Sequence, residues 1–188
     1  GERAGEGMTM PEMLDVIAQL LVAGNETTTK LIAAATLMLV ENPEQMAKVR
    51  ADHSLIPNLV EEALRMEAPV QMLPRFTKDD VEVGGVVIPK GSVVMAMYGC
   101  ANRDGAKYPN PDMFDIERDN ARTQLAFGQG PHFCVGAALA RSEARIAFEL
   151  LLSRLNNIAL ANVDTPTHRE LSMTLRGLTN LHLTFTPA

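Results

Sequence analysis

One run of helix-forming residues, from Met10 to about Val40, restricts the folds open to this chain more than any other feature of its sequence. Thr9-Met10-Pro11-Glu12 has the pattern of a capping box with an early proline, which marks the start of a helix. The run ends at Asn42-Pro43, because the residue before a proline is disfavoured in helical geometry. The expected helix is roughly thirty residues long, whereas the mean in globular proteins is about 11–12.

The residues that follow predict a mostly α fold with small β-sheets. Shorter helices are expected from Asn42 to about Asp52 and from about Ile56 to Met66. The valine-rich residues 80–97 predict strands, with turns at Gly84-Gly85 and Pro89-Lys90-Gly91.

The second half of the chain begins with little regular structure. Residues 102–133 are dense in Pro, Gly, Asp and Asn, and an irregular stretch of that length is usually functional. A helix is expected to resume near Gly136, and residues 171–186 alternate around Gly177 as a hairpin would. The expected apolar face of the helix after Gly136 carries Leu139, Ile146 and Leu150.

Composition excludes several classes of protein. With 188 residues, 46% of them hydrophobic, the chain is long enough to bury one sizeable core. A net charge of −6 without a basic stripe argues against a nucleic-acid partner. The two cysteines, Cys100 and Cys134, are too few for a disulfide framework and favour a reducing, cytoplasmic setting. No apolar run reaches the length of a membrane span, and the first seven residues do not resemble a signal peptide.

The best candidate for chemistry is Cys134, in the ten residues Phe-Gly-Gln-Gly-Pro-His-Phe-Cys-Val-Gly from Phe127 to Gly136. This cysteine lies where a loop turns into a helix, and the positive end of a helix dipole favours a thiolate. Three glycines in ten residues allow the backbone to approach a flat ligand and to direct N–H groups at the sulfur.

Other interpretations of this segment fit less well. A lone cysteine is usually a small buried hydrophobe, which suits Cys100 in its strand-like run. Gly128-Gln129-Gly130 lacks the third glycine of a dinucleotide loop and the lysine of a phosphate-binding loop. Cys134 has no Cys or His partners at zinc spacing, and His132 two residues away would be unusual in a cysteine protease.

The ten residues match F-G-x-G-x-H-x-C-x-G, the haem-loop signature of the cytochrome P450 family, at every fixed position. Glu62-Ala63-Leu64-Arg65 matches the family's E-x-x-R, and residues 114–118 resemble the stretch that supplies a second arginine, Arg118. Residues 23–28 match the oxygen-activating segment of the long central helix. The resemblance implies the cytochrome P450 fold and a haem b cofactor, with Cys134 as the axial thiolate ligand of the iron. Such a ligand favours cleavage of the O–O bond of bound dioxygen.

The middle of the long helix is unusual in its own right. Gly24 costs about 1 kcal/mol relative to alanine inside a helix, and the Thr27 hydroxyl can bond to the Ala23 carbonyl, so the helix is loosened there. Without the haem loop, a solvated face with a local bend explains these residues equally well. The resemblance implies that Glu26 and Thr27 are the acid and the alcohol that deliver protons to bound dioxygen.

The remaining site residues are assigned by resemblance alone. Arg75 and His132 are the candidates for binding the haem propionates, for which an arginine is geometrically suited. Glu62, Arg65 and Arg118 are expected to form a scaffold behind the haem loop. The residues expected to line the haem are Phe127, Gly128, Gly136, Ala23 and Gly24. The residues expected to line a substrate pocket, although core packing would explain them equally, are Val22, Val70, Gln71, Met72 and Leu73.

Residues 1–188 correspond only to the C-terminal half of such a protein, as a single haem-binding portion. The N-terminal half, which covers the haem and the substrate in this family, is expected to be a separate chain, to be exchanged with a second copy, or to be lost in an inactive remnant. The start at Gly1 favours a cut piece.

The resemblance implies a monooxygenase that inserts one oxygen atom from dioxygen into a hydrophobic small molecule. Its electrons would come from a ferredoxin-type donor, which Arg141 and Arg145 would help to attract if it is acidic. A peroxide-driven haem enzyme and a non-catalytic haem-binding fragment remain alternatives. The substrate, the position oxidised and the identity of the donor do not follow from the sequence.

Overall fold

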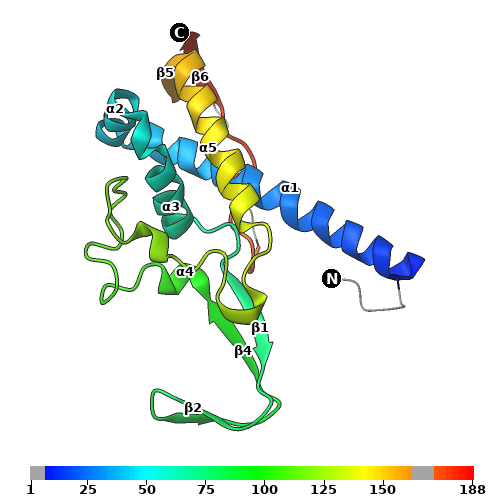
Figure 1. Cartoon of the computed structure of the whole chain (residues 1–188). Coiled ribbons are helices and arrows are strands. Elements are labelled where there is room, and N and C mark those ends of the chain that lie inside the picture. The colour runs from blue at the N-terminus through cyan, green and yellow to red at the C-terminus, as the bar shows by residue number, and fades with distance from the viewer. Residues whose placement is uncertain (1–6, 162–171) are drawn as a thin grey trace.

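The computed structural model describes residues 7–161 and 172–188, and its framework is a long helix, α1 (Met10–Glu41). The helix begins as the sequence predicts, because the Thr9 backbone N–H donates to the Glu12 carboxylate at 2.8 Å and the Thr9 hydroxyl accepts from the Glu12 N–H. Figure 1 shows the N-terminal half of α1 extending away from the other helices. Its C-terminal half is mostly buried between Thr28 and Leu39.

Helices α2 (Pro43–Ala51), α3 (Ile56–Met66) and α5 (Ala137–Arg154) pack against that buried half, whereas α4 (Tyr98–Ala101) lies beside a pair of strands (Figure 1). Single 3-10 turns lie at His53–Leu55, Ala121–Thr123 and Gly130–His132. The main core forms where α1, α3 and α5 meet. Its fully buried members include Leu39, Leu59, Ala63, Ala144 and Phe148.

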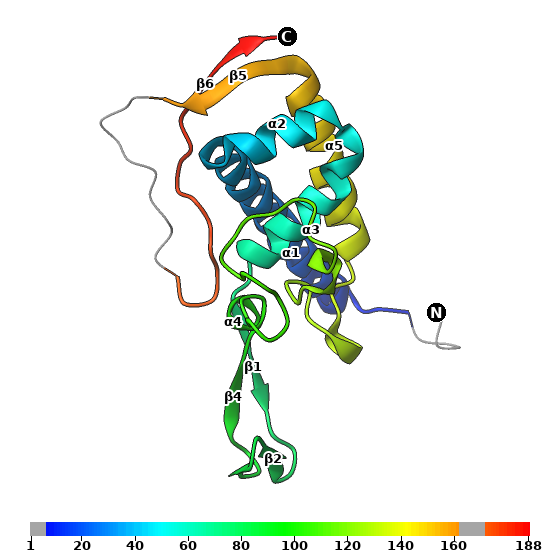
Figure 2. The same cartoon turned by 90° about the vertical axis from the view of Figure 1, so that its left-hand side faces the viewer.

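Each sheet in the described part of the chain is a two-stranded antiparallel pair. Strand β1 (Met72–Phe76) pairs with β4 (Val93–Met97), and β2 (Val81–Val83) pairs with β3 (Val86–Ile88) across the predicted Gly84-Gly85 turn. Both glycines have positive φ, 58° and 80°, as a two-residue hairpin turn requires. Figure 2 shows these strands as an arm that projects from the helices.

The predicted C-terminal hairpin is wrong over the described residues, 172–186. Leu171 lies outside the described residues, and β6 (Leu183–Pro187) pairs with β5 (Leu155–Leu160), directly after α5. Nearer Gly177, Leu175 forms an isolated bridge to Val70. The alternation that suggested a hairpin therefore reflects pairing with distant segments.

The apolar face predicted for α5 is not the face that the described residues bury. Leu139, Ile146 and Leu150 are 63%, 47% and 44% exposed. The buried positions of α5 are Ala137, Ala144, Phe148 and Leu152. Alanines allow α5 to approach α1 and α3 closely, which leaves its larger aliphatic residues outside.

The N-terminal half of α1 also presents apolar side chains to solvent. Its exposed large residues include Leu14, Ile17, Leu20, Leu21 and Val22, the last 70% exposed. An exposed apolar surface of this extent usually marks a contact region. None of the helices in the described ranges combines the length and the apolar character needed to cross a membrane.

Candidate functional site

The loop from Phe127 to Gly136 is held in a tight, backbone-bonded form. The Cys134 N–H donates to the Phe127 carbonyl at 2.9 Å, and the Phe133 N–H donates to the Gly130 carbonyl at 3.0 Å. Gly128 and Gly130 have φ of 71° and 74°, a region that residues with a Cβ rarely adopt. Gly128 and Gly130 are therefore required by the backbone conformation of the loop.

Cys134 lies just before α5 with its side chain exposed. Gly136 is the N-cap of that helix and no side chain caps it. The Ala137 N–H donates to the Cys134 carbonyl at 3.3 Å, and the next N–H groups of the first turn have no capping side chain. A Cβ added to Gly136 would lie 3.8 Å from the Cys134 sulfur, which shows how close the thiol is to the first turn. The sulfur thus lies beside an uncapped helix N-terminus, an arrangement that favours negative charge.

Arg75 reaches the loop through a tyrosine that the sequence did not single out. Arg75, on β1, donates from Nη2 to the Tyr98 hydroxyl at 3.0 Å. A Cβ on Gly128 would lie 3.6 Å from that hydroxyl, so Tyr98 packs against the loop. Tyr98 is buried and follows β4 directly, where the sequence suggested only strand packing. The only sequence signal for a role of Tyr98 was its polar hydroxyl directly after an apolar strand.

His132 and Phe127 belong to the same loop but have different surroundings. His132 is exposed in the 3-10 turn Gly130–His132, and no side-chain hydrogen bond of His132 is found within the described ranges. Phe127 is half-buried, with its ring centroid 6.3 Å from that of Phe133 and the Arg141 guanidinium 4.5 Å from its centre. The loop therefore offers one free imidazole and two neighbouring rings.

Behind the loop, the two arginines and the glutamate expected to form a scaffold are in contact. Arg65 donates from Nε and Nη2 to the two Glu62 oxygens, at 2.7 and 2.8 Å. Arg118 donates from Nε to Glu62 Oε1 at 3.0 Å. Glu62 and Arg65 are fully buried and Arg118 nearly so.

The same two arginines bind the irregular segment between β4 and the loop. Arg65 donates to the carbonyls of Asn102 and Pro111, at 3.0 and 2.7 Å. Arg118 donates to the carbonyl of Pro109 at 2.8 Å. The cluster thus holds a stretch that has little secondary structure of its own.

The middle of α1 has the local features that its sequence suggests. The Thr27 hydroxyl donates to the Ala23 carbonyl at 2.8 Å, and nothing lies within 4 Å of a Cβ added to Gly24. Glu26 forms an ion pair at 2.8 Å with Lys30, a partner that the sequence analysis missed although the two lie at the i,i+4 spacing of a helix pair. Across the described residues, no hydrogen bond or ion pair joins residues 22–27 to the 127–136 loop, so the structure does not bring these two groups into direct contact.

Residues 70–73, which are expected to line a substrate pocket, lie before and within β1, and their side chains are partly exposed. Gln71 donates from its amide to the Ala68 carbonyl at 2.6 Å, and its backbone N–H donates to the Thr174 carbonyl at 2.8 Å. Val70 bridges to Leu175, whereas Met72 and Leu73 pair with β4. The fifth expected residue, Val22, is exposed on α1.

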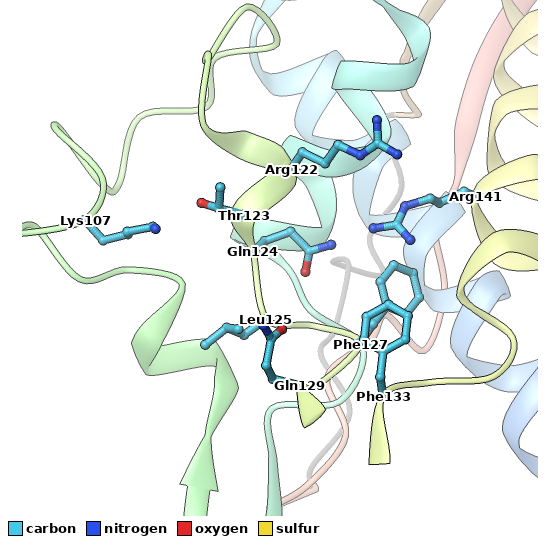
Figure 3. Close-up of a pocket in the computed structure, with 9 residues that line it drawn as sticks. All are labelled: Lys107, Arg122, Thr123, Gln124, Leu125, Phe127, Gln129, Phe133 and Arg141. Atoms are coloured by element: carbon cyan, nitrogen blue, oxygen red, sulfur yellow. The ribbon is translucent and has the colours of Figure 1, made fainter. Parts of the chain in front are cut away.

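A basic pocket of about 550 Å³ lies between the loop and the segment that precedes it, with Arg141 of α5 at its edge. Figure 3 shows Arg122 and Arg141 approaching it from different elements, above the rings of Phe127 and Phe133. The residues around it are Lys107, Arg122, Thr123, Gln124, Leu125, Phe127, Gln129, Phe133 and Arg141. Arg141 is bound to Glu61 at 2.6 Å, whereas Lys107 and Arg122 are exposed and form no ion pair with any described residue.

The residues present fit a haem better than an ion bound by protein ligands alone. In the described ranges no group of three or more His, Cys, Asp or Glu side chains could hold a metal. The exposed thiol of Cys134 suits an iron whose other ligands come from a macrocycle. Exposed apolar side chains at Val22, Leu73 and Phe133 suit its flat faces, and Arg75 suits its carboxylates.

Comparison with known proteins gives a match to the family described as Cytochrome P450 over residues 1–185. Cytochrome P450 107B1 of Saccharopolyspora erythraea is 45% identical over 182 residues, 96% of this chain and 44% of that protein. Cytochrome P450 monooxygenase PikC of Streptomyces venezuelae is 46% identical over 157 residues, 83% of this chain and 38% of that protein. The solved structure of Cytochrome P450 CYP109Q5 from Chondromyces apiculatus superposes with a TM-score of 0.92 at 46% identity, covering 100% of this chain and 48% of that one. The chain thus spans less than half the length of these relatives.

Proposed function

This chain belongs to the cytochrome P450 family, and we propose that it is the haem-binding half of a monooxygenase. The observation that carries the proposal is the position of Cys134, exposed beside the uncapped N-terminus of α5 in a loop held by glycines of positive φ. That arrangement supports a thiolate ligand to the iron of a haem b. A relative named as a monooxygenase shares 46% identity with the chain.

Residues 1–188 would form a single haem-binding portion that is completed by a second piece of protein. The exposed apolar side chains of the N-terminal half of α1, together with Leu139, Ile146 and Leu150 of α5, support this view. The covering piece would be the N-terminal half of the domain or a second copy of this chain.

In the completed site, Arg75 would bind a haem propionate, with Tyr98 holding its guanidinium in place. His132, exposed in the same loop, would bind the other. Phe127, Gly128 and Gly136 would contact one face of the ring system, and Ala23 and Gly24 the other. The bound haem would supply the chemistry by which one oxygen atom of dioxygen is inserted into a substrate with two electrons from a donor.

Glu26 and Thr27 would supply protons to that site. The Thr27 hydroxyl is bonded to the Ala23 carbonyl, which fixes its oxygen on the helix and leaves its lone pairs free to accept from a water. The Glu26 side chain is half-exposed and can exchange protons with such a water.

The substrate would be a hydrophobic small molecule. Val22 on α1 and the residues 70–73 before and within β1 present apolar and half-exposed side chains, with Gln71 as a polar exception. Met72 adapts its shape easily, as residues in sites that accept varied apolar ligands commonly do.

The electron donor would be a ferredoxin-type protein of the cytoplasm. The side chains expected to attract it differ from the two arginines suggested by the sequence. Arg141 and Arg145, expected from the sequence, are bound to Glu61 and Glu149, each at 2.6 Å. Lys107 and Arg122 form no ion pair with the described residues and are the better candidates for an acidic partner.

The test is to supply the complete, haem-loaded protein with a ferredoxin, its reductase and isotopically labelled dioxygen over a panel of hydrophobic compounds. The proposal expects one labelled oxygen atom in a product. Oxidation with hydrogen peroxide but none with reductant and dioxygen would favour a peroxide-driven enzyme, and no oxidation under either condition would favour a non-catalytic fragment.

A further inference from the structure

The ion pair between Glu26 and Lys30 differs from an ordinary surface pair because one partner is buried. The two residues are one turn apart on α1, with the acid on the N-terminal side, which is the more favourable order on a helix. Lys30 Nζ lies 2.8 Å from Glu26 Oε1. The Lys30 side chain is only 8% exposed, whereas that of Glu26 is 47% exposed. The buried residue is therefore the fixed member of the pair, and the carboxylate is the member that solvent can reach.

Lys30 is fixed by a glycine from the other end of the chain. A Cβ added to Gly177 would lie 2.6 Å from Lys30 Cγ and 2.7 Å from Cδ, closer than real contacts allow. The backbone at Gly177 therefore packs directly on the lysine stem. The φ of Gly177 is not in the positive region, so the need for glycine here is a need for space.

The loop that contains Gly177 is itself anchored. Arg176 donates from Nε to the Glu67 carboxylate at 2.6 Å, and this carboxylate raises the pKa of Arg176 above its ordinary value. The Arg176 N–H donates to the Pro69 carbonyl at 2.9 Å. The backbone bond from Gln71 to the Thr174 carbonyl, at 2.8 Å, adds a further link. The lysine stem is thus confined between α1 and a loop that is bonded to residues 67–71.

We propose that Lys30 is a positioning residue for Glu26, holding its carboxylate in one orientation next to Thr27, and that Gly177 provides the space for the lysine. A carboxylate on an exposed helix face normally samples several rotamers, and an ammonium with an immobilised stem restricts them. The proposal rests on the proposed role of Glu26 in proton delivery. It adds that this role depends on a residue one turn away and on a loop some 150 residues later in the sequence.

The test uses the complete, haem-loaded protein and two independent measurements. The first is the side-chain ammonium resonance of Lys30 in nuclear magnetic resonance, assigned by its loss in Lys30→Met. Burial and the ion pair should slow its hydrogen exchange, and Glu26→Gln should make that exchange faster. The second is the ratio of hydrogen peroxide to water formed from dioxygen with reductant and no added substrate. Peroxide consumes two protons per dioxygen, whereas cleavage to water consumes four, so poorer proton delivery raises the peroxide share.

We expect Lys30→Met to raise the peroxide share about threefold to tenfold, less than the 10²–10⁴-fold contribution of a general acid itself. Lys30→Arg should give a peroxide share close to that of the parent, because it keeps the positive charge. Gly177→Ala should give a share between those of the parent and Lys30→Met, because the added Cβ displaces the lysine stem. The matched control is Lys48→Met. It removes a lysine of α2 that pairs with Glu117 and lies outside the proposed site. It should leave the ratio unchanged.

Two results would overturn the inference while leaving the proposed function intact. One is an ammonium exchange rate that Glu26→Gln does not alter. The other is a parent-like peroxide share in Lys30→Met and Gly177→Ala although Glu26→Gln raises it. If Glu26→Gln itself leaves the share unchanged, the proton-delivery role of Glu26 is overturned, and this inference falls with it.

Discussion

Arg118 Nε lies 3.0 Å from Glu62 Oε1, and this contact joins helix α3 to the irregular segment 56 residues further along the chain. Glu62 also receives two hydrogen bonds from Arg65, so one buried carboxylate serves two guanidinium groups. Each arginine uses its remaining N–H groups on backbone carbonyls of the segment. The cluster therefore fixes the segment that precedes the Cys134 loop, and in the described residues no hydrogen bond or ion pair joins it to the loop itself.

Removing Arg118 should be costly, because the carbonyls of Pro109 and Asn110 lose their guanidinium donor and Glu62 loses one of its two arginines. Arg118→Met should lower the free energy of unfolding by about 2–5 kcal/mol, because each buried acceptor left unsatisfied costs about 1–3 kcal/mol. Denaturant unfolding of the haem-loaded protein measures this loss. Lys48→Met, which breaks an exposed ion pair with Glu117, is the control and should cause no measurable loss. Equal stability of the Arg118 variant and the parent would show that the cluster does not hold the segment.

The glycines of the loop should tolerate substitution according to their backbone conformation. Gly128→Ala forces a residue with a Cβ into φ of 71°, which should cost about 1–2 kcal/mol and weaken haem binding. Gly105→Ala, at a position with open space and no positive φ, is the matched control and should leave stability and haem binding unchanged. Haem titration and thermal unfolding of the two variants measure the difference. A Gly128 variant that behaves like the Gly105 variant would contradict the account.

Tyr98 should contribute to haem affinity through Arg75. Tyr98→Phe removes the hydroxyl that accepts from Arg75, and the loss of one hydrogen bond of about 0.5–1.5 kcal/mol should raise the rate of haem loss severalfold. Transfer of haem to an excess of an apo-globin measures this rate. The control is Tyr108→Phe, because the Tyr108 hydroxyl bonds to Thr123 rather than to Arg75. Equal rates of haem loss in the two variants would show that the Tyr98 hydroxyl does not contribute to haem binding.

The start of α1 should depend on pH. Hydrogen bonds from the Thr9 backbone and hydroxyl lower the pKa of Glu12 below its ordinary value. Since the folded value is the lower one, the stabilisation is present above the ordinary pKa and is lost as the pH falls through the lowered value. Amide exchange of the first turn of α1 should therefore quicken in that acidic range. Glu12→Gln, which has no carboxylate to protonate, should show no such acid dependence, and a parent protein without acid-dependent exchange would contradict the prediction.

Local signals in the sequence predicted the elements whose ends are set locally. The capping box at Thr9 and the proline at position 43 delimit α1, and Gly84-Gly85 forms the predicted hairpin turn. The contact of Glu62 with Arg65 follows from their spacing of three residues on one helix. Its extension to Arg118 was predicted only through the family resemblance, because no local rule relates the two positions.

Features that depend on distant packing were missed. The buried face of α5 is formed by two alanines, Phe148 and Leu152, so the hydrophobic pattern favoured the wrong side. Strand β5 carries Asn157 with φ of 51°, which interrupts the alternation that would have indicated a strand. Tyr98 belongs to the site only through its tertiary contact with Arg75, which no spacing in the sequence reveals. The pairing of Lys30 with Glu26 follows their i,i+4 spacing, but the burial of Lys30 against Gly177 does not.

The most direct test of the account is the absorption spectrum of the complete, haem-loaded protein, reduced and bound to carbon monoxide. The account predicts a strongly red-shifted Soret band in the parent and in Cys100→Ala, and loss of that band in Cys134→Ala. A parent protein that binds haem without this band, or a Cys134 variant that retains it, would show that Cys134 is not the thiolate ligand.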